Sequence, residues 1–267
     1  PYVLHLHHPP QFLYTADWNW ARNSFKRRFS FIGGKVLKAP LRKFDRYCVK
    51  NAEFYFSESR SVQKTISAIY GIKSIVLYPT IEKQFKIIKT NMGQLSKYGI
   101  NKNFVLGSGR IIGQKRFDYL IEAFSKLPSS KKNNFQLVLA GKYEENEKKL
   151  LENIASEKNV TVLFTGPLDK EELVKFYNLA KATVLTCPKE WFGLVPVEAM
   201  SCGCPVVAWK DNWGPQESII PEKSGLLARP YHTKDLGEKL NRTLSEKWNK
   251  KQISAFVKKF SEKAQST

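Results

Sequence analysis

The chain has 267 residues, of which 42% are hydrophobic and 25% charged, and its formal net charge is +20. Such a composition excludes a disordered chain, and this length can bury one large core or two smaller ones. No apolar run reaches the roughly 18 residues of a membrane-spanning helix, and no basic-then-apolar signal segment opens the sequence. We therefore expect a cytoplasmic protein.

The first 85 residues contain few predicted elements. Strands are expected at "YVLHL" (2–6), "EFYFSES" (53–59) and "SIVLYP" (74–79), and a helix near 60–70. We interpret this as the second half of an α/β domain. The first strand is expected to be buried, yet nothing before it could pair with it, and residue 1 is Pro rather than Met, so we suspect a fragment. The polar stretch 86–103 is predicted to be a linker.

A basic segment lies within this first part. Residues 22–50 contain ten basic residues and one acid, Asp45. Apolar side chains lie between or just before these charges: Trp18, Trp20, Phe25, Phe29, Phe31, Val36 and Leu37. This pattern suits an anionic membrane surface or a nucleic acid. A solvated basic face with its aromatic side chains in the core is the alternative.

From residue 104 onward, short apolar runs alternate with helical patterns. Predicted strands lie at 104–109, 135–141, 160–166, 182–187, 205–209 and 225–228, with helices between them and two closing helices. This rhythm is typical of a parallel sheet covered on both faces. We predict a doubly wound, Rossmann-like domain over residues 104–247 and a closing helix within residues 248–267.

Three polar segments fall where strands of such a sheet end, which is where open parallel sheets bind ligands. In the first, "GSGRIIGQK", Gly109 and Arg110 follow a strand and Lys115 precedes a helix. Two cations on one loop suit a diphosphate, Arg110 through its planar fork and Lys115 as a compact charge. Taken alone, this segment is better explained by two solvated surface charges.

The second segment is "EWFGLVPVEAM", residues 190–200. Phe192, Gly193 and Leu194 lie where the loop becomes a helix, so their N–H groups are free and the helix dipole favours an anion. Glu198, about one turn into the helix, suits two ribose hydroxyls, and Glu190 lies nearer a reacting sugar. The alternative is a pair of glutamates favoured by the helix dipole alone.

The third segment, "SCGCPVVAWKDNWGPQESI", ends in Gly214, Pro215 and Glu217, which by themselves indicate ordinary helix capping. Its two cysteines, Cys202 and Cys204, lack a second ligand pair at zinc spacing. We expect them to be small buried residues and predict no metal site.

In this order the segments resemble the donor half of glycosyltransferase family 4, the retaining enzymes of GT-B type. The resemblance covers residues 104–230, and its most specific element is Glu190 and Glu198 with seven residues between them. It implies an α/β protein of GT-B type, in which a complete Rossmann-like donor domain follows part of a Rossmann-like acceptor domain, residues 1–85. "HLHHPPQFLY" resembles the mannosyltransferase-like branch, truncated at its N-terminus.

The resemblance also implies residue roles. The catalytic residues of the family correspond in this chain to His7, Glu190, Arg110 and Lys115. The residues that bind its donor correspond to Gly109, Arg110, Lys115, Glu190, Phe192, Gly193, Leu194 and Glu198. Arg110 and Lys115 match the pair that holds the diphosphate, and Glu198 matches the ribose-binding glutamate. Gln11 and Glu58 stand where the family usually has an arginine and an asparagine, and both departures concern the acceptor half.

We therefore expect a retaining hexosyltransferase of polysaccharide biosynthesis that acts on a saccharide or lipid-linked acceptor. The donor is a nucleotide diphosphate sugar, with GDP-mannose as the first guess, and no cofactor is expected. Arg110 and Lys115 would do the work of a metal, since no D-x-D signature appears. The basic segment predicts peripheral contact with anionic lipid on the inner face of the membrane.

Three alternatives stay open. The chain is an inactive nucleotide-sugar-binding remnant if the missing start of its first domain is essential. A basic nucleic-acid-binding protein is the second alternative, and only the net charge suggests it. Our preferred interpretation includes no nucleic-acid partner. A glycosidase would need two carboxylates facing each other across a sugar at roughly 5 to 9.5 Å.

Overall fold

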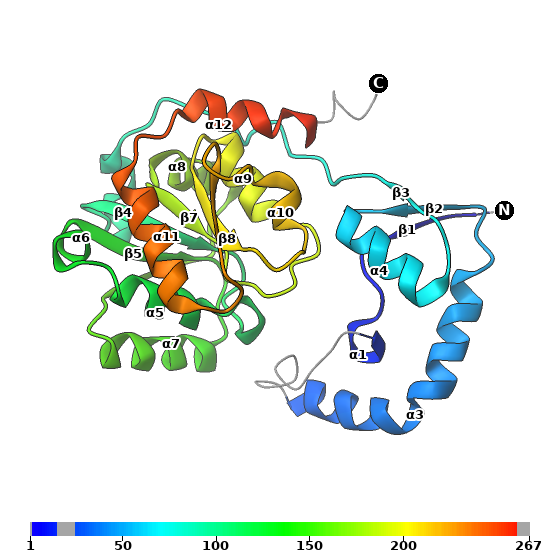
Figure 1. Cartoon of the computed structure of the whole chain (residues 1–267). Coiled ribbons are helices and arrows are strands. Elements are labelled where there is room, and N and C mark those ends of the chain that lie inside the picture. The colour runs from blue at the N-terminus through cyan, green and yellow to red at the C-terminus, as the bar shows by residue number, and fades with distance from the viewer. Residues whose placement is uncertain (1, 15–24, 261–267) are drawn as a thin grey trace. The chain divides into compact units, whose positions relative to one another are not determined.

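The computed structural model describes residues 2–14 and 25–260, without the side chains of residues 11, 12 and 25–36. The chain divides into two compact units, Pro1–Pro79 and Thr80–Thr267. Within the described residues, each unit contains one parallel β-sheet with helices packed on it (Figure 1).

The second unit is built on a six-stranded sheet in the order β6-β5-β4-β7-β8-β9. Its strands are β4 (Asn103–Ser108), β5 (Phe135–Ala140), β6 (Val162–Gly166), β7 (Ala182–Val184), β8 (Val206–Trp209) and β9 (Gly225–Ala228). All pairs are parallel. The chain builds outward from β4 to β6, returns to β7 and builds outward on the other side, so the strand order reverses between β4 and β7.

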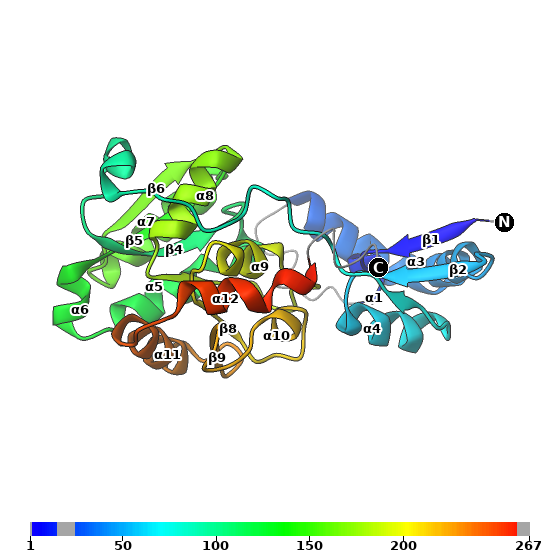
Figure 2. The same cartoon turned by 90° about the horizontal axis from the view of Figure 1, so that it is seen from above.

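Helices cover both faces of this sheet (Figures 1 and 2). One face carries α5 (Phe117–Ser125), α7 (Glu145–Glu157) and α11 (Thr233–Ser245). The other face carries α8 (Lys170–Leu179), α9 (Leu194–Ser201) and α12 (Lys250–Phe256). The unit also contains the short elements α6 (Ser129–Asn134), α10 (Pro215–Ser218), η2 (Gly113–Lys115) and η3 (Lys258–Phe260). The central strands are buried on both sides, which explains their continuous apolar sequence. The predicted doubly wound domain is confirmed.

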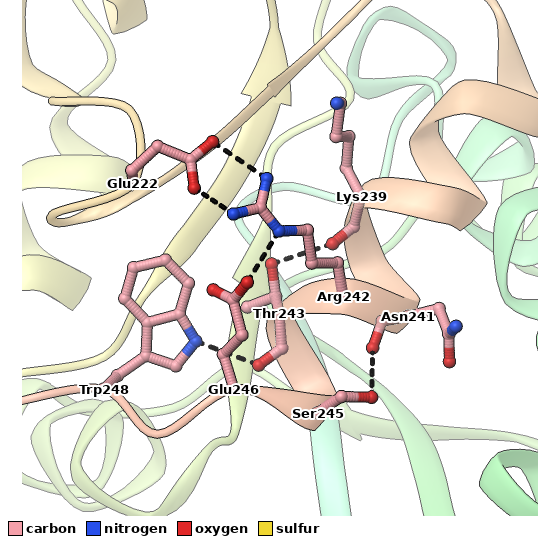
Figure 3. Close-up of polar contacts among 8 residues, drawn as sticks. All are labelled: Glu222, Lys239, Asn241, Arg242, Thr243, Ser245, Glu246 and Trp248. Atoms are coloured by element: carbon pink, nitrogen blue, oxygen red, sulfur yellow. Dashed lines mark hydrogen bonds and ion pairs between the residues drawn. The ribbon is translucent and has the colours of Figure 1, made fainter.

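Polar contacts link α11 to the turn before the edge strand β9 and to the chain that follows the helix (Figure 3). Arg242 on α11 donates to both carboxylate oxygens of Glu222, in the turn before β9, and also to Glu246, at 2.6 Å. The indole Nε1 of Trp248 donates to the Thr243 carbonyl at 2.9 Å. The C-terminal end of α11 is therefore tied both to the edge of the sheet and to the chain that leads into α12.

The first unit has a three-stranded parallel sheet in the order β1-β2-β3. Its elements are β1 (Val3–Leu6), α1 (Gln11–Tyr14), α3 (Phe25–Val49), β2 (Phe54–Ser57), α4 (Arg60–Tyr70) and β3 (Ile75–Val76). Asp45 on α3 accepts hydrogen bonds from the hydroxyls of Tyr14 and Tyr70, each at 2.8 Å, and so joins the three helices. The expectation that the first strand is buried is wrong, because β1 is an edge strand here and Val3 is 57% exposed.

Helix α3 carries most of the basic segment. It runs for 25 residues through Pro40. Trp18 and Trp20 lie outside the described residues, as do the side chains of Phe25, Phe29, Phe31 and Val36. Within the described part of the chain, no helix combines the length and apolar character that crossing a bilayer requires.

Residues 80–102 lead into the second unit and pack on it. They include η1 (Met92–Tyr98), whose Leu95 is buried. The Ile81 N–H donates to the Phe260 carbonyl at 2.9 Å, whereas the Leu77 N–H donates within the first unit, to Ser57 at 2.8 Å. The buried Asn178 side chain on α8 accepts from the Ile88 N–H and donates to the Lys86 carbonyl. Residues 86–103, predicted as a linker, are thus attached to the second unit at several points.

Candidate functional site

The candidate site forms at the carboxyl ends of β4 and β7, where the strand order reverses. Gly109 directly follows β4, and its N–H donates to the Ala140 carbonyl at 3.0 Å. A Cβ at Gly141, whose φ is 145°, would lie 2.0 Å from the Gly109 carbonyl oxygen. Only glycine at position 141 lets the two strand ends approach so closely, and this approach presents Arg110 as an exposed side chain.

Lys115 and Glu190 lie in direct contact. The Lys115 Nζ donates to the Glu190 Oε2 at 2.6 Å, and both side chains are mostly buried, with 23% and 19% exposure. Lys115 ends the η2 turn that follows β4, and Glu190 lies on the loop between β7 and α9. Residues 75 positions apart in sequence therefore meet across the reversal point.

The surroundings of Lys115 keep it charged. Burial lowers the pKa of the Lys115 ammonium, but the nearby Cys187 and the Glu190 carboxylate act in the opposite direction and raise it overall. The Lys115 carbonyl accepts a hydrogen bond from the Thr186 hydroxyl at 2.9 Å, and the Gln114 carbonyl accepts one from the Cys187 thiol at 3.4 Å. These bonds hold the two loops together on either side of the ion pair.

The loop that carries Glu190 turns into α9 at Gly193, which has φ 83°. A Cβ on Gly193 would meet the Glu190 Cγ at 3.3 Å, so glycine gives the carboxylate its room. Phe192 is buried with its ring against Phe260, whereas Leu194 is 45% exposed. The N–H groups in the first turn of α9 have no partner further back in the helix. Because Pro196 has no N–H, the donors that this turn offers to an anion are those of Leu194 and Val195, which follow Glu190 closely in the chain.

Glu198 lies on α9 and is held by a neighbouring helix. The hydroxyl of Tyr177, on α8, contacts both the Glu198 Oε2, at 3.1 Å, and the Ser108 Oγ at the end of β4, at 3.0 Å. Burial raises the pKa of Glu198, while the hydrogen bond from Tyr177 and the charge of Lys170 act to lower it and Glu82 adds to the rise. Glu198 is a partly buried carboxylate whose orientation depends on α8.

A second loop, between β8 and α10, supports the first. The Asp211 Oδ2 accepts from the Lys189 N–H at 3.0 Å, and the Gly214 N–H donates to the Glu190 carbonyl at 2.9 Å. The Trp191 and Trp213 rings meet edge to face, with centroids 4.7 Å apart. Burial raises the pKa of Asp211. The backbone on both sides of Glu190 is therefore fixed by this second loop.

His7 lies in the first unit, just after β1. Its Nδ1 is 2.9 Å from the Oε2 of Glu58, which is largely buried, while the His7 side chain is 65% exposed. The His5 ring lies 4.7 Å away. Glu58, which departs from the family pattern, is thus the residue that orients the His7 ring.

The remaining predicted residues gather in the second unit. Gly109, Arg110, Lys115, Glu190, Phe192, Gly193, Leu194 and Glu198 all lie on the two loops and the helix that surround the ends of β4 and β7. Sequence reasoning missed Tyr177 and Asp211. Tyr177 lies in an apolar helical run and carries no signal, whereas Asp211 is a polar residue directly after a strand and could have been found. Cys202 and Cys204 are buried, as predicted.

The arrangement suits a ligand that carries both phosphate and hydroxyl groups. Arg110, Lys115 and the start of α9 supply positive charge and hydrogen-bond donors for phosphate. Glu190 and Glu198 are acceptors for hydroxyl groups. Within residues 2–14 and 25–260, no cluster of three or more His, Cys, Asp or Glu side chains could hold a metal ion.

Several curated proteins are similar to this chain, and two of them are described here. The chain is 25% identical over 210 residues to the serotype-specific mannosyltransferase WbdA of Escherichia coli, covering 74% of this chain and 25% of that protein. It is 26% identical over 264 residues to the uncharacterized glycosyltransferase MJ1178 of Methanocaldococcus jannaschii, covering 98% and 64%. The chain therefore spans about a quarter and just under two thirds of these proteins.

The solved structure of Anabaena HepE in complex with UDP matches 99% of this chain and 68% of its own, with a TM-score of 0.76 at 20% identity. This likeness shows the fold, and the expected GT-B type is confirmed. The family model of the Glycosyl transferases group 1 matches residues 94–266, which is well over half of the chain. The chain belongs to the Glycosyl transferases group 1 family.

Proposed function

We propose that this chain is part of a hexosyltransferase that uses a nucleotide diphosphate sugar and retains the anomeric configuration. The observation that carries the proposal is the contact between Lys115 and Glu190 beside the first turn of α9. It joins a cation for a diphosphate to a carboxylate for a sugar at the reversal point of the sheet. Mannose is our first candidate for the sugar, since WbdA is a mannosyltransferase, and GDP-mannose for the donor.

The proposed mechanism assigns each group a task. When the glycosidic bond to the diphosphate breaks, negative charge grows on the leaving oxygen, and Arg110, Lys115 and the α9 N–H groups stabilise it. Glu190 accepts hydroxyl hydrogens of the sugar and keeps Lys115 oriented. Glu198 accepts hydroxyl hydrogens of the ribose and so aligns the nucleotide.

A ligand panel tests the donor class. GDP-, UDP- and ADP-sugars are added to the chain and the rise in melting temperature is measured, since a ligand that binds only the folded state stabilises it. Glu198→Ala is expected to weaken binding of the nucleoside diphosphate by about 1.5 to 3 kcal/mol, because it removes charged hydrogen bonds. Glu152→Ala, an exposed carboxylate on α7, serves as the control. Equal affinity of both variants for the nucleoside diphosphate would show that Glu198 does not bind the nucleotide.

Release of the nucleoside diphosphate separates an enzyme from a binding remnant. A chain that binds the sugar nucleotide and never releases nucleoside diphosphate, with simple sugars or lipid-linked saccharides as acceptors, would support the remnant. We expect release with one class of acceptor, a saccharide or a lipid-linked saccharide.

The acceptor side is proposed to contact anionic lipid through α3. On its described part, the apolar side chains Leu37, Leu41, Phe44 and Tyr47 and the basic side chains Lys43 and Arg46 are exposed, as is Lys50, which directly follows the helix. The spacing of Leu37, Leu41 and Phe44 places them on one helix face. Each cation near anionic lipid contributes about 1 kcal/mol, so salt should weaken the contact.

Vesicle sedimentation tests this contact. Anionic vesicles at low salt should bind the chain more strongly than neutral vesicles, and Phe44→Ser should reduce that binding. Leu150→Ser is the control, because Leu150 is an exposed apolar residue on α7 of the second unit. Equal binding to both vesicle types would argue against the membrane contact.

A further inference from the structure

Tyr177 is a fully buried residue that links two parts of the candidate site. Its hydroxyl lies 3.1 Å from the Glu198 Oε2 and 3.0 Å from the Ser108 Oγ. Ser108 ends β4, one residue before Gly109 and two before Arg110. The α8 helix therefore joins the start of the phosphate-binding loop to the carboxylate on α9.

Tyr177 donates its single phenol proton in the hydrogen bond to the Glu198 carboxylate. An ionised carboxylate only accepts hydrogen bonds, whereas a serine hydroxyl both donates and accepts. The arrangement that satisfies all three groups has Tyr177 donating to Glu198 and Ser108 donating to the Tyr177 oxygen. One carboxylate oxygen is thereby occupied, and among the described residues no hydrogen bond reaches the other, Oε1.

Tyr177 itself is held rigidly. Its side chain is 0% exposed and its ring lies 6.1 Å from that of Phe85. Its neighbour Asn178 binds the backbone of residues 86–88. A hydroxyl fixed in this way restricts the rotation of the Glu198 carboxyl group, whose side chain would otherwise sample several rotamers.

We propose that Tyr177 is the positioning residue of the ribose site: its hydroxyl holds Glu198 Oε2 so that Oε1 is presented to the ribose hydroxyls of the nucleotide. This inference rests on the proposed role of Glu198. It adds a residue that touches no part of the ligand and acts only through the carboxylate.

The experiment compares ligands with and without ribose hydroxyls. Calorimetry measures the dissociation constants of GDP and UDP and of their 2′,3′-dideoxy counterparts. The preference for the ribose form is the ratio of the two constants. We expect Glu198→Gln to reduce this preference roughly 10- to 150-fold, as charged hydrogen bonds are lost. Tyr177→Phe is expected to reduce it about 2- to 10-fold with the dideoxy affinity unchanged.

Ser108→Ala is the matched control. It alters the same buried cluster but leaves the bond from Tyr177 to Glu198, so the preference should stay that of the wild type. If Tyr177→Phe does not fold, the double variant Ser108→Ala/Tyr177→Phe replaces it, because no buried hydroxyl is then left without a partner. This variant should show the same loss of preference.

The outcomes separate the two proposals. If Glu198→Gln removes the preference and Tyr177→Phe keeps it, Glu198 binds ribose and the positioning role is overturned. Equal loss of ribose and dideoxy affinity in Tyr177→Phe would also overturn it, since that result indicates a general structural effect. A preference unchanged by Glu198→Gln would overturn the proposed ribose role of Glu198 itself.

Discussion

Gly214→Ala tests whether the loop after β8 sets the position of Glu190. Gly214 has φ −46° and ψ −42°, which alanine adopts readily, so the substitution causes no backbone strain. The new Cβ, however, would lie 2.3 Å from the Phe192 Cα and 2.4 Å from the Trp191 carbonyl oxygen. Ordinary contact begins at 3.4 Å, so the backbone of residues 191–192 must move by about 1 Å.

This displacement has two measurable effects. Crowding of this kind costs about 1 to 3 kcal/mol of unfolding free energy, and each kcal/mol lowers the melting temperature of a unit of this size by about 2 to 4 °C. A shift of about 1 Å at a catalytic group lowers kcat/KM about 100-fold, or about 2.7 kcal/mol of transition-state stabilisation. The rate is followed as release of nucleoside diphosphate from the donor chosen by the ligand panel.

Gly93→Ala serves as the control, because its Cβ would meet only the Asn91 side-chain oxygen, at 3.1 Å. This variant should keep the wild-type rate. A Gly214→Ala protein with wild-type melting temperature and rate would refute the idea that the two loops hold each other. A lower melting temperature with an unchanged rate would show that the position of Glu190 does not govern turnover.

Three further results are expected. Because burial raises the pKa of Glu198, nucleotide affinity should begin to fall above pH 4.5 as the pH is lowered. Calorimetry should show a larger loss in the wild type than in Glu198→Gln, because the terminal phosphate of the ligand takes up a proton at about pH 6 with both proteins. Lys115→Met should lower the free energy of unfolding, measured in urea, by about 2 kcal/mol, because it leaves Glu190 without its ion-pair partner. The double variant Lys115→Met/Glu190→Gln should recover this stability but not the affinity for diphosphate. A double variant as unstable as the single one would contradict the pairing. Asp211→Ala should weaken diphosphate binding more than Asp211→Asn, which keeps an acceptor for the Lys189 N–H; equal affinities would argue against this contact.

Much of the second unit could be predicted because its signals are local. The runs at 135–141 and 205–209 became β5 and β8 within a residue or two, since buried parallel strands need continuous apolar sequence. Helix α3 was not predicted, because Pro40 and the paired glycines Gly33 and Gly34 disfavour a helix locally. Its 25 residues became evident only from the structure.

The site was predictable only in part, for a related reason. Lys115 and Glu190 were found through the loops that carry them, and both loops do end at the same edge of the sheet. Their mutual contact, and the support from Asp211, depend on which strands are neighbours. Strand order is a property of the whole sheet and leaves no trace in either segment alone. The Tyr177 bond to Glu198 likewise joins two helices whose packing no local pattern records.

The chain passes from one unit to the other between Leu77, whose N–H binds within the first unit, and Ile81, whose N–H binds within the second. Pro79 fixes its own φ near −65° and restricts the residue before it to extended conformations. Both restrictions fall within the few residues between these two hydrogen bonds, so the connection has less torsional freedom than one without proline.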